Sequence, residues 1–119
     1  MRTEENIIEL KSFEFAVRII NLYKFVVYNK NETILAKQIL RSGTSIGANV
    51  TEAQKGQSKA DFYAKMNIAL KEANETYYWL RLLCATDYIS EKEFISLEND
   101  IKEIISILVA ITKQQKLEN

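Results

Sequence analysis

The chain contains no proline and only three glycines in 119 residues, so little in it can interrupt a helix. Apolar residues recur at helical spacing in four stretches, separated by three short polar links. Links this short make consecutive helices antiparallel neighbours. We therefore predict a single all-α domain over residues 1–119, an antiparallel up-down-up-down four-helix bundle. Its helices are expected at about 6–28, 32–55, 59–86 and 91–115.

Residues suited to helix ends stand at each of these links. Asn31 is expected to cap the second helix, and Gly56 suits a left-handed residue just past the end of that helix. Ser58 and Ser90 each precede an acidic residue by three positions, which is the spacing of a capping box. These signals set the predicted boundaries.

The first helix is more apolar than a bundle helix needs to be. Its polar residues form one narrow stripe (Glu14, Arg18, Asn21 and Lys24), and most other positions from Phe13 to Val27 are apolar. Extra apolar surface must be covered by something. One interpretation is a subunit interface; the alternative is that neighbouring helices of the same subunit wrap these flanks. The candidate interface residues are Phe15, Ile19, Leu22, Val26 and, from the third helix, Trp79.

The composition argues against an enzyme. The chain has no histidine and one cysteine, which excludes histidine-activated nucleophiles and histidine-bearing zinc or di-iron sites. Cys84 is expected to be an inert buried thiol. Glu72 and Glu75 lie one turn apart and could hold a hard cation, but this spacing is more typical of a solvated or salt-bridged surface. We predict no metal and no cofactor.

Positive charge is concentrated in the middle of a chain whose formal net charge is zero. Between Lys30 and Lys71, seven basic residues stand against three acidic ones. Five helical turns separate two lysines of the second helix, so these point the same way. This face could contact phosphates; an ordinary solvated face is the alternative. The candidate nucleic-acid-binding residues are Lys37, Arg41, Lys55 and Lys59.

The second helix contains an unusual run of small and polar residues. Two glycines one turn apart cost a helix about 1 kcal/mol each relative to alanine, so something should offset them. We favour close packing against a neighbouring helix; a polar binding groove and a loop are the alternatives. The residues concerned are Ser42, Gly43, Ser45, Gly47 and Asn49.

Residues Gln38 to Ala53, QILRSGTSIGANVTEA, are similar to the bacterial four-helix-bundle family of 23S ribosomal RNA intervening-sequence proteins. A sister branch of that family is the accessory variability determinants of diversity-generating retroelements. The similarity continues to Tyr78-Trp79-Leu80 and covers roughly residues 10 to 115. It implies a cytoplasmic bundle that assembles into a ring-shaped homopentamer, without catalytic residues. It also implies binding to structured RNA or to a complex of nucleic acid and enzyme.

Two functions are therefore expected to compete. The first is a non-enzymatic homo-oligomer that associates with RNA or DNA through the basic face of the second helix. The alternative is a protein-interaction scaffold for a partner enzyme such as a reverse transcriptase. No uninterrupted apolar run reaches the length of about 18 residues that a membrane span requires. The single cysteine and the absence of a signal peptide predict a cytoplasmic location.

Overall fold

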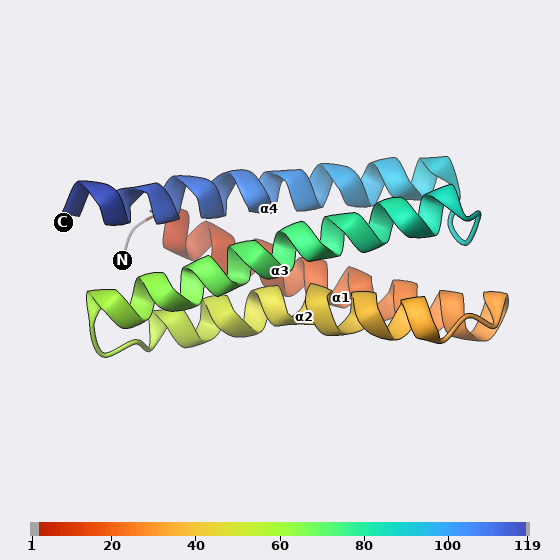
Figure 1. The fold of residues 1–119 in the computed structure, drawn as a ribbon, viewed down its shortest axis with the longest axis horizontal. Coiled ribbons are helices and arrows are strands. Elements are labelled where there is room, and N and C mark those ends of the chain that lie inside the picture. The colour runs from red at the N-terminus through yellow and green to blue at the C-terminus, as the bar shows by residue number, and fades with distance from the viewer. Residues whose placement is uncertain (1–2, 119) are drawn as a thin grey trace.

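The computed structural model describes residues 3–118, which form four long helices. They are α1 (Thr3–Lys30), α2 (Ile34–Gln54), α3 (Lys59–Ala85) and α4 (Glu91–Glu118). The chain runs back and forth along a rod of 47 × 21 × 19 Å, and α4 returns beside α1 (Figure 1). The predicted all-α bundle is confirmed, and the predicted helix boundaries are within three residues of the observed ones.

The core takes one stripe of apolar side chains from each helix. The stripe of α1 is made of residues whose exposed fractions are 5% or less: Ile8, Phe15, Ile19, Leu22 and Val26. Four of these five were expected at a subunit interface, and the structure instead buries them inside a single subunit. The expectation failed because α1 is apolar around most of its circumference. Periodicity then could not tell which apolar face points inward.

Two glycines let α1 and α2 approach each other closely. A Cβ atom built on Gly43 would lie 2.8 Å from both γ-carbons of Ile19. A Cβ atom on Gly47 would lie 3.3 Å from the carbonyl oxygen of Ser12. The residues between them are helical, so close packing is the observed role of the glycines and the loop alternative is wrong.

The polar residues of this segment satisfy one another inside the bundle. The Thr76 hydroxyl of α3 donates to the buried Ser42 hydroxyl at 2.9 Å. The Ser45 hydroxyl donates to the carbonyl of Arg41, and the Asn49 amide donates to the carbonyl of Ser45. These groups therefore bond within the subunit and do not form a polar binding groove.

Two of the predicted helix-end signals act differently from expectation. Asn31 adopts a left-handed backbone with φ of 57° and ends α1, so it does not cap α2. Thr33 occupies the N-cap of α2 without a side-chain hydrogen bond. Gly56 is not left-handed, since none of the glycines in the described residues has a positive φ; instead its Cβ would lie 3.1 Å from the carbonyl oxygen of Ala53.

The other links follow the predicted capping rules, with one addition. Ser58 and Ser90 each accept a hydrogen bond at 3.1 Å from the backbone N–H three residues later. Asp87 has φ of 66° and ends α3, with the N–H of Tyr88 donating to the carbonyl of Leu83 at 2.9 Å. This is a Schellman ending with aspartate at the position that glycine usually holds.

The contact between α1 and α4 is held partly by ion pairs near the surface. The Lys11 ammonium lies 3.0 Å from the Glu103 carboxylate, and the Arg18 guanidinium lies 2.6 Å from the Asp100 carboxylate. All four side chains are between one-third and about one-half exposed. Because these pairs are partly hydrated, each contributes little to the free energy of folding.

We predict that Gly43→Ala lowers the free energy of unfolding by about 1–3 kcal/mol, because the added methyl group overpacks the stiff, β-branched Ile19. Urea unfolding measures the change. In an Ile19→Ala background the same substitution should cost much less, since the obstructing γ-carbons are gone. An equal cost in both backgrounds would contradict the packing role of Gly43.

Candidate functional site

A line of apolar side chains on α1 faces away from the core. We call it the outer stripe; its members and exposed fractions are Leu10 (59%), Phe13 (68%), Val17 (45%) and Ile20 (39%). Their spacings of three, four and three residues place them in register along one side of the helix. Scattered exposed apolar residues are ordinary, but this spacing is typical of a contact with another helix.

Trp79, the fifth predicted interface residue, is partly buried and packs against the core. Its indole N–H donates to the Glu75 carboxylate at 2.9 Å. The ring is therefore held within the subunit, and the apolar surface available on the outside belongs mainly to α1.

The lysines of the predicted basic face lie at opposite ends of α2. Lys37 and Lys55 are exposed and form no ion pair among residues 3–118. Eighteen residues separate them, which is about 27 Å along a helix. Lys59, at the start of α3, is 80% exposed, and its ammonium lies 3.7 Å from the Glu118 carboxylate.

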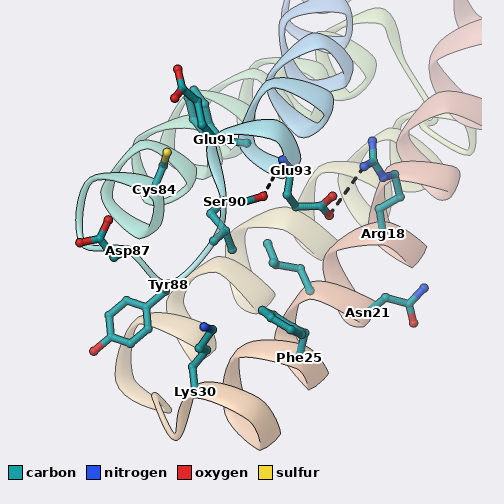
Figure 2. A pocket seen from close by; sticks show the side chains of 13 residues that line it. Arg18, Asn21, Phe25, Lys30, Cys84, Asp87, Tyr88, Ser90, Glu91 and Glu93 are labelled. Atoms are coloured by element: carbon teal, nitrogen blue, oxygen red, sulfur yellow. Dashed lines mark hydrogen bonds and ion pairs between the residues drawn. The ribbon is translucent and has the colours of Figure 1, made fainter.

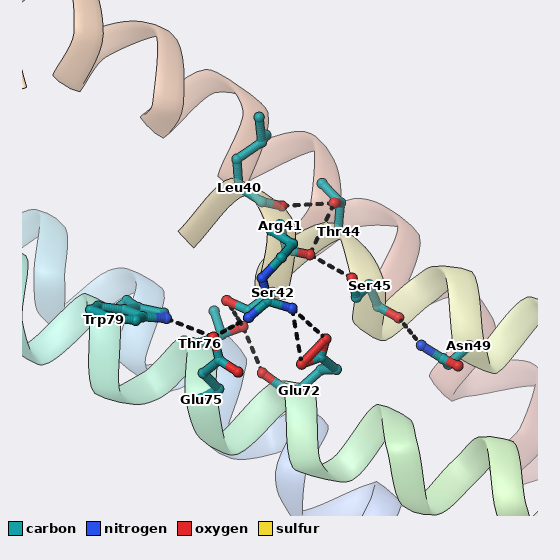
Figure 3. A network of polar contacts seen from close by, with 10 residues as sticks. All are labelled: Leu40, Arg41, Ser42, Thr44, Ser45, Asn49, Glu72, Glu75, Thr76 and Trp79. Carbon is teal, nitrogen blue, oxygen red and sulfur yellow. Dashed lines mark hydrogen bonds and ion pairs between the residues drawn. The ribbon is translucent and has the colours of Figure 1, made fainter. Parts of the chain in front are cut away.

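Arg41 lies between these lysines, and its charge is taken up by α3 (Figure 3). Its guanidinium donates to the Glu72 carboxylate at 3.0 Å and also bonds to Glu75. The side chain thus clamps α2 to α3 and is not a lone cation available to a phosphate. The spacing along α2 predicted its direction but not the two carboxylates facing it.

This clamp also accounts for the paired carboxylates considered for a cation. Glu72 and Glu75 are salt-bridged, in agreement with the favoured interpretation of their spacing. No group of three or more metal-ligating side chains occurs within residues 3–118.

The same contacts shift the acidity of the groups involved. The Trp79 N–H bond, together with the Arg41 hydrogen bond and charge, holds the pKa of Glu75 below its ordinary value of 4.5. The hydrogen bond to Glu75 raises the pKa of Arg41. Both residues are therefore ionised over the physiological range, so pH does not break the clamp there.

A hollow at one end of the bundle was not expected from the sequence (Figure 2). We call it the end groove; it lies between the second half of α1 and the α3–α4 turn, and its volume is about 1030 Å³. Because separate segments build it, no single run of residues signals it. Its lining residues are Arg18, Asn21, Leu22, Phe25, Lys30, Cys84, Asp87, Tyr88, Ile89, Ser90, Glu91, Glu93 and Phe94.

Cys84 differs from its predicted position. The thiol was expected deep in the core, but the residue is only partly buried and lines the end groove. It lies in the last turn of α3, where Leu83 takes the inward position.

Within residues 3–118, none of the helices combines the length and the apolar character that crossing a bilayer requires.

Comparison with known proteins agrees with this architecture. Residues 4–110 match the family model of the 23S rRNA-intervening sequence protein. A crystal structure of a protein of unknown function from the S23 ribosomal protein family of Bacteroides thetaiotaomicron VPI-5482 is 57% identical. The TM-score is 0.92, and the match covers 93% of this chain and 99% of that chain. No functionally curated protein matches the chain.

We predict that Trp79→Phe raises the pKa of Glu75 toward 4.5, because it removes the largest cause of the depression. A carboxyl group with a depressed pKa stabilises the fold above its unfolded pKa, and this stabilisation is lost as the pH falls through the folded value. The variant should therefore lose less stability on acidification than the wild type.

A carbon-detected NMR titration of the Glu75 carboxyl group and urea unfolding at neutral and acid pH measure the two effects. Tyr78→Phe is the matched control, since Tyr78 is an exposed neighbour without a bond to Glu75. An unchanged Glu75 pKa in Trp79→Phe would contradict the assignment.

Proposed function

Because the chain belongs to the 23S rRNA-intervening sequence protein family, we propose that it is a non-enzymatic cytoplasmic protein that self-associates and binds structured RNA. Self-association carries the proposal, and the outer stripe of α1 is the observation that supports it. We propose a homopentameric ring, which is what the family resemblance implies.

The outer stripe supports self-association through its position and its spacing. It lies on the side of α1 opposite the core stripe, so no helix of the same subunit can cover it. A second copy would remove four large apolar side chains from water, which is the main driving force of association. In a closed ring every subunit hides this surface.

We predict that Val17→Glu reduces the assembly to single subunits of 13.8 kDa, because a buried unpaired carboxylate is strongly unfavourable at an apolar contact. Light scattering coupled to size exclusion measures the mass. Ile34→Glu is the matched control: Ile34 is 74% exposed and lies outside the outer stripe. A wild-type protein that is already a single subunit would refute self-association.

RNA association is the second part of the proposal, and it rests on the exposed lysines. Lys37, Lys55 and Lys59 keep most of their charge toward solvent, whereas Arg41 is neutralised. A single subunit offers only a few lysines to phosphates, and these lysines lie far apart. A ring would repeat each lysine around its rim, so that weak contacts add together.

We predict that the triple variant Lys37→Gln, Lys55→Gln, Lys59→Gln weakens RNA binding and lowers the salt dependence of the affinity. Each lost phosphate contact should reduce the slope of log affinity against log salt by roughly 0.7–0.9. Filter binding over a salt series measures it. Lys102→Gln is the control, because Lys102 pairs with Glu98 on α4. An identical slope in the triple variant would exclude these lysines from the interface.

A protein scaffold is the competing proposal, and the neutralised Arg41 together with a net charge of zero favours it. In that case a partner protein, such as a reverse transcriptase, covers the exposed apolar surface. Affinity capture from nuclease-treated lysate separates the two proposals: a partner that persists without RNA supports the scaffold, and complete loss of co-purifying material argues against it.

A further inference from the structure

We propose that the end groove binds one unpaired nucleotide of a single-stranded nucleic acid. The base would stack on an aromatic ring of the groove wall, Phe25 or Tyr88, and its phosphate would meet Lys30. This inference rests on the proposed RNA association, and it assigns that association a site away from the lysines of α2.

The aromatic walls are the first argument. Phe25 and Tyr88 stand on two sides of the hollow, and Lys30 reaches between them from the end of α1 (Figure 2). Phe25 is 43% exposed although it is a large apolar residue, and the flexible Lys30 side chain that lies over its ring would move aside toward the phosphate when a base stacks there. Aromatic rings beside a cation are the arrangement with which proteins hold unpaired bases, since every base offers a flat π-face.

The positions of the charges are the second argument. The Lys30 ammonium lies 5.8 Å from the centre of the Phe25 ring and forms no ion pair among residues 3–118. Arg18, the other cation of the groove, is already bound to Asp100 and lies 3.9 Å from Glu93. Lys30 is therefore the cation that remains for a phosphate.

The acidic residues of the groove orient the ligand. Asp87, Glu91 and Glu93 all belong to the α3–α4 turn or to the first turn of α4, whereas both cations belong to α1. A phosphate is thus kept on the α1 side. A carboxylate that faces position 4 of the base accepts a hydrogen bond from the amino group of cytosine but repels the carbonyl oxygen of uracil, so Glu93 in that position would favour cytosine.

The size and the openness of the groove fit a single strand. Its volume of about 1030 Å³ lies just above the range of typical small-molecule sites, which is about 300–1,000 Å³, so the groove has room for a base with its sugar and phosphate. A base inside a duplex is stacked and paired, and it cannot enter such a hollow without being extruded. Unpaired loop or end nucleotides are therefore the expected ligands.

The test uses the full chain with labelled eight-nucleotide single strands of cytidine or uridine, and with a duplex. Phe25→Leu keeps an apolar side chain but removes the ring, and we expect about a tenfold loss of affinity for the cytidine strand. Tyr28→Leu is the matched control, because Tyr28 lies on the same helix, is 78% exposed and does not line the groove. It should bind like the wild type.

Further variants test the orientation of the ligand. Lys30→Gln should weaken both strands equally, since it removes a phosphate contact. Glu93→Gln should reduce the preference for cytidine over uridine. Wild-type affinity in Phe25→Leu would overturn the inference, and so would an equal loss in Tyr28→Leu.

The outcomes separate this inference from the function on which it rests. If RNA binds and only the lysine variants of α2 weaken it, the proposed function stands and the groove site is refuted. If the wild type retains no RNA at low salt, both fail. If Phe25→Leu lowers the mass of the assembly, the groove is a contact between subunits, and the nucleotide site is likewise refuted.

Discussion

The close contact between α1 and α2 determines most of what this molecule presents to its surroundings. Gly43 and Gly47 leave room for Ile19 and for the backbone at Ser12, and the observed rotation of α1 uses both positions. That rotation sends Phe15 and its companions into the core and turns the outer stripe toward solvent. The small residues of α2 thus help to decide which apolar face of α1 is buried and which faces solvent.

This contact also explains how far prediction from the sequence could reach. Helix number, boundaries and antiparallel order follow from local signals that are strong here, namely the absence of proline, the polar links and the serine caps. The orientation of α1 could not be predicted, because its apolar residues cover most of its circumference. The ion-pair partners of Arg41 lie on another helix, and the end groove is lined by residues from separate helices. No local sequence pattern predicts such contacts. The roles of Asn31 and Asp87 could not be predicted either, because asparagine and aspartate suit both helix starts and left-handed helix ends.

Membership of the 23S rRNA-intervening sequence family fits a protein that works through its surfaces. The polar groups of the shared segment are consumed within the bundle: Ser42 bonds to Thr76, and Arg41 bonds to two glutamates. The segment from Gln38 to Ala53 therefore serves the architecture, and the proposed interactions are assigned to the outer stripe, the exposed lysines and the end groove. These three regions differ in chemistry, so the proposed apolar contact between subunits and the proposed polar contact with nucleic acid would not compete for the same side chains.

The ion pairs between α1 and α4 make the contact between these two helices sensitive to salt. Lys11 with Glu103 and Arg18 with Asp100 are partly hydrated, and dissolved ions screen such pairs far more than they affect a buried apolar seam. Rising ionic strength would therefore weaken these pairs, and likewise the partly exposed pairs between α2 and α3, more than the buried apolar contacts. Because Arg18 also lines the end groove, dissolved salt would weaken its pairing with Asp100 at the same concentrations that shield the charge of Lys30.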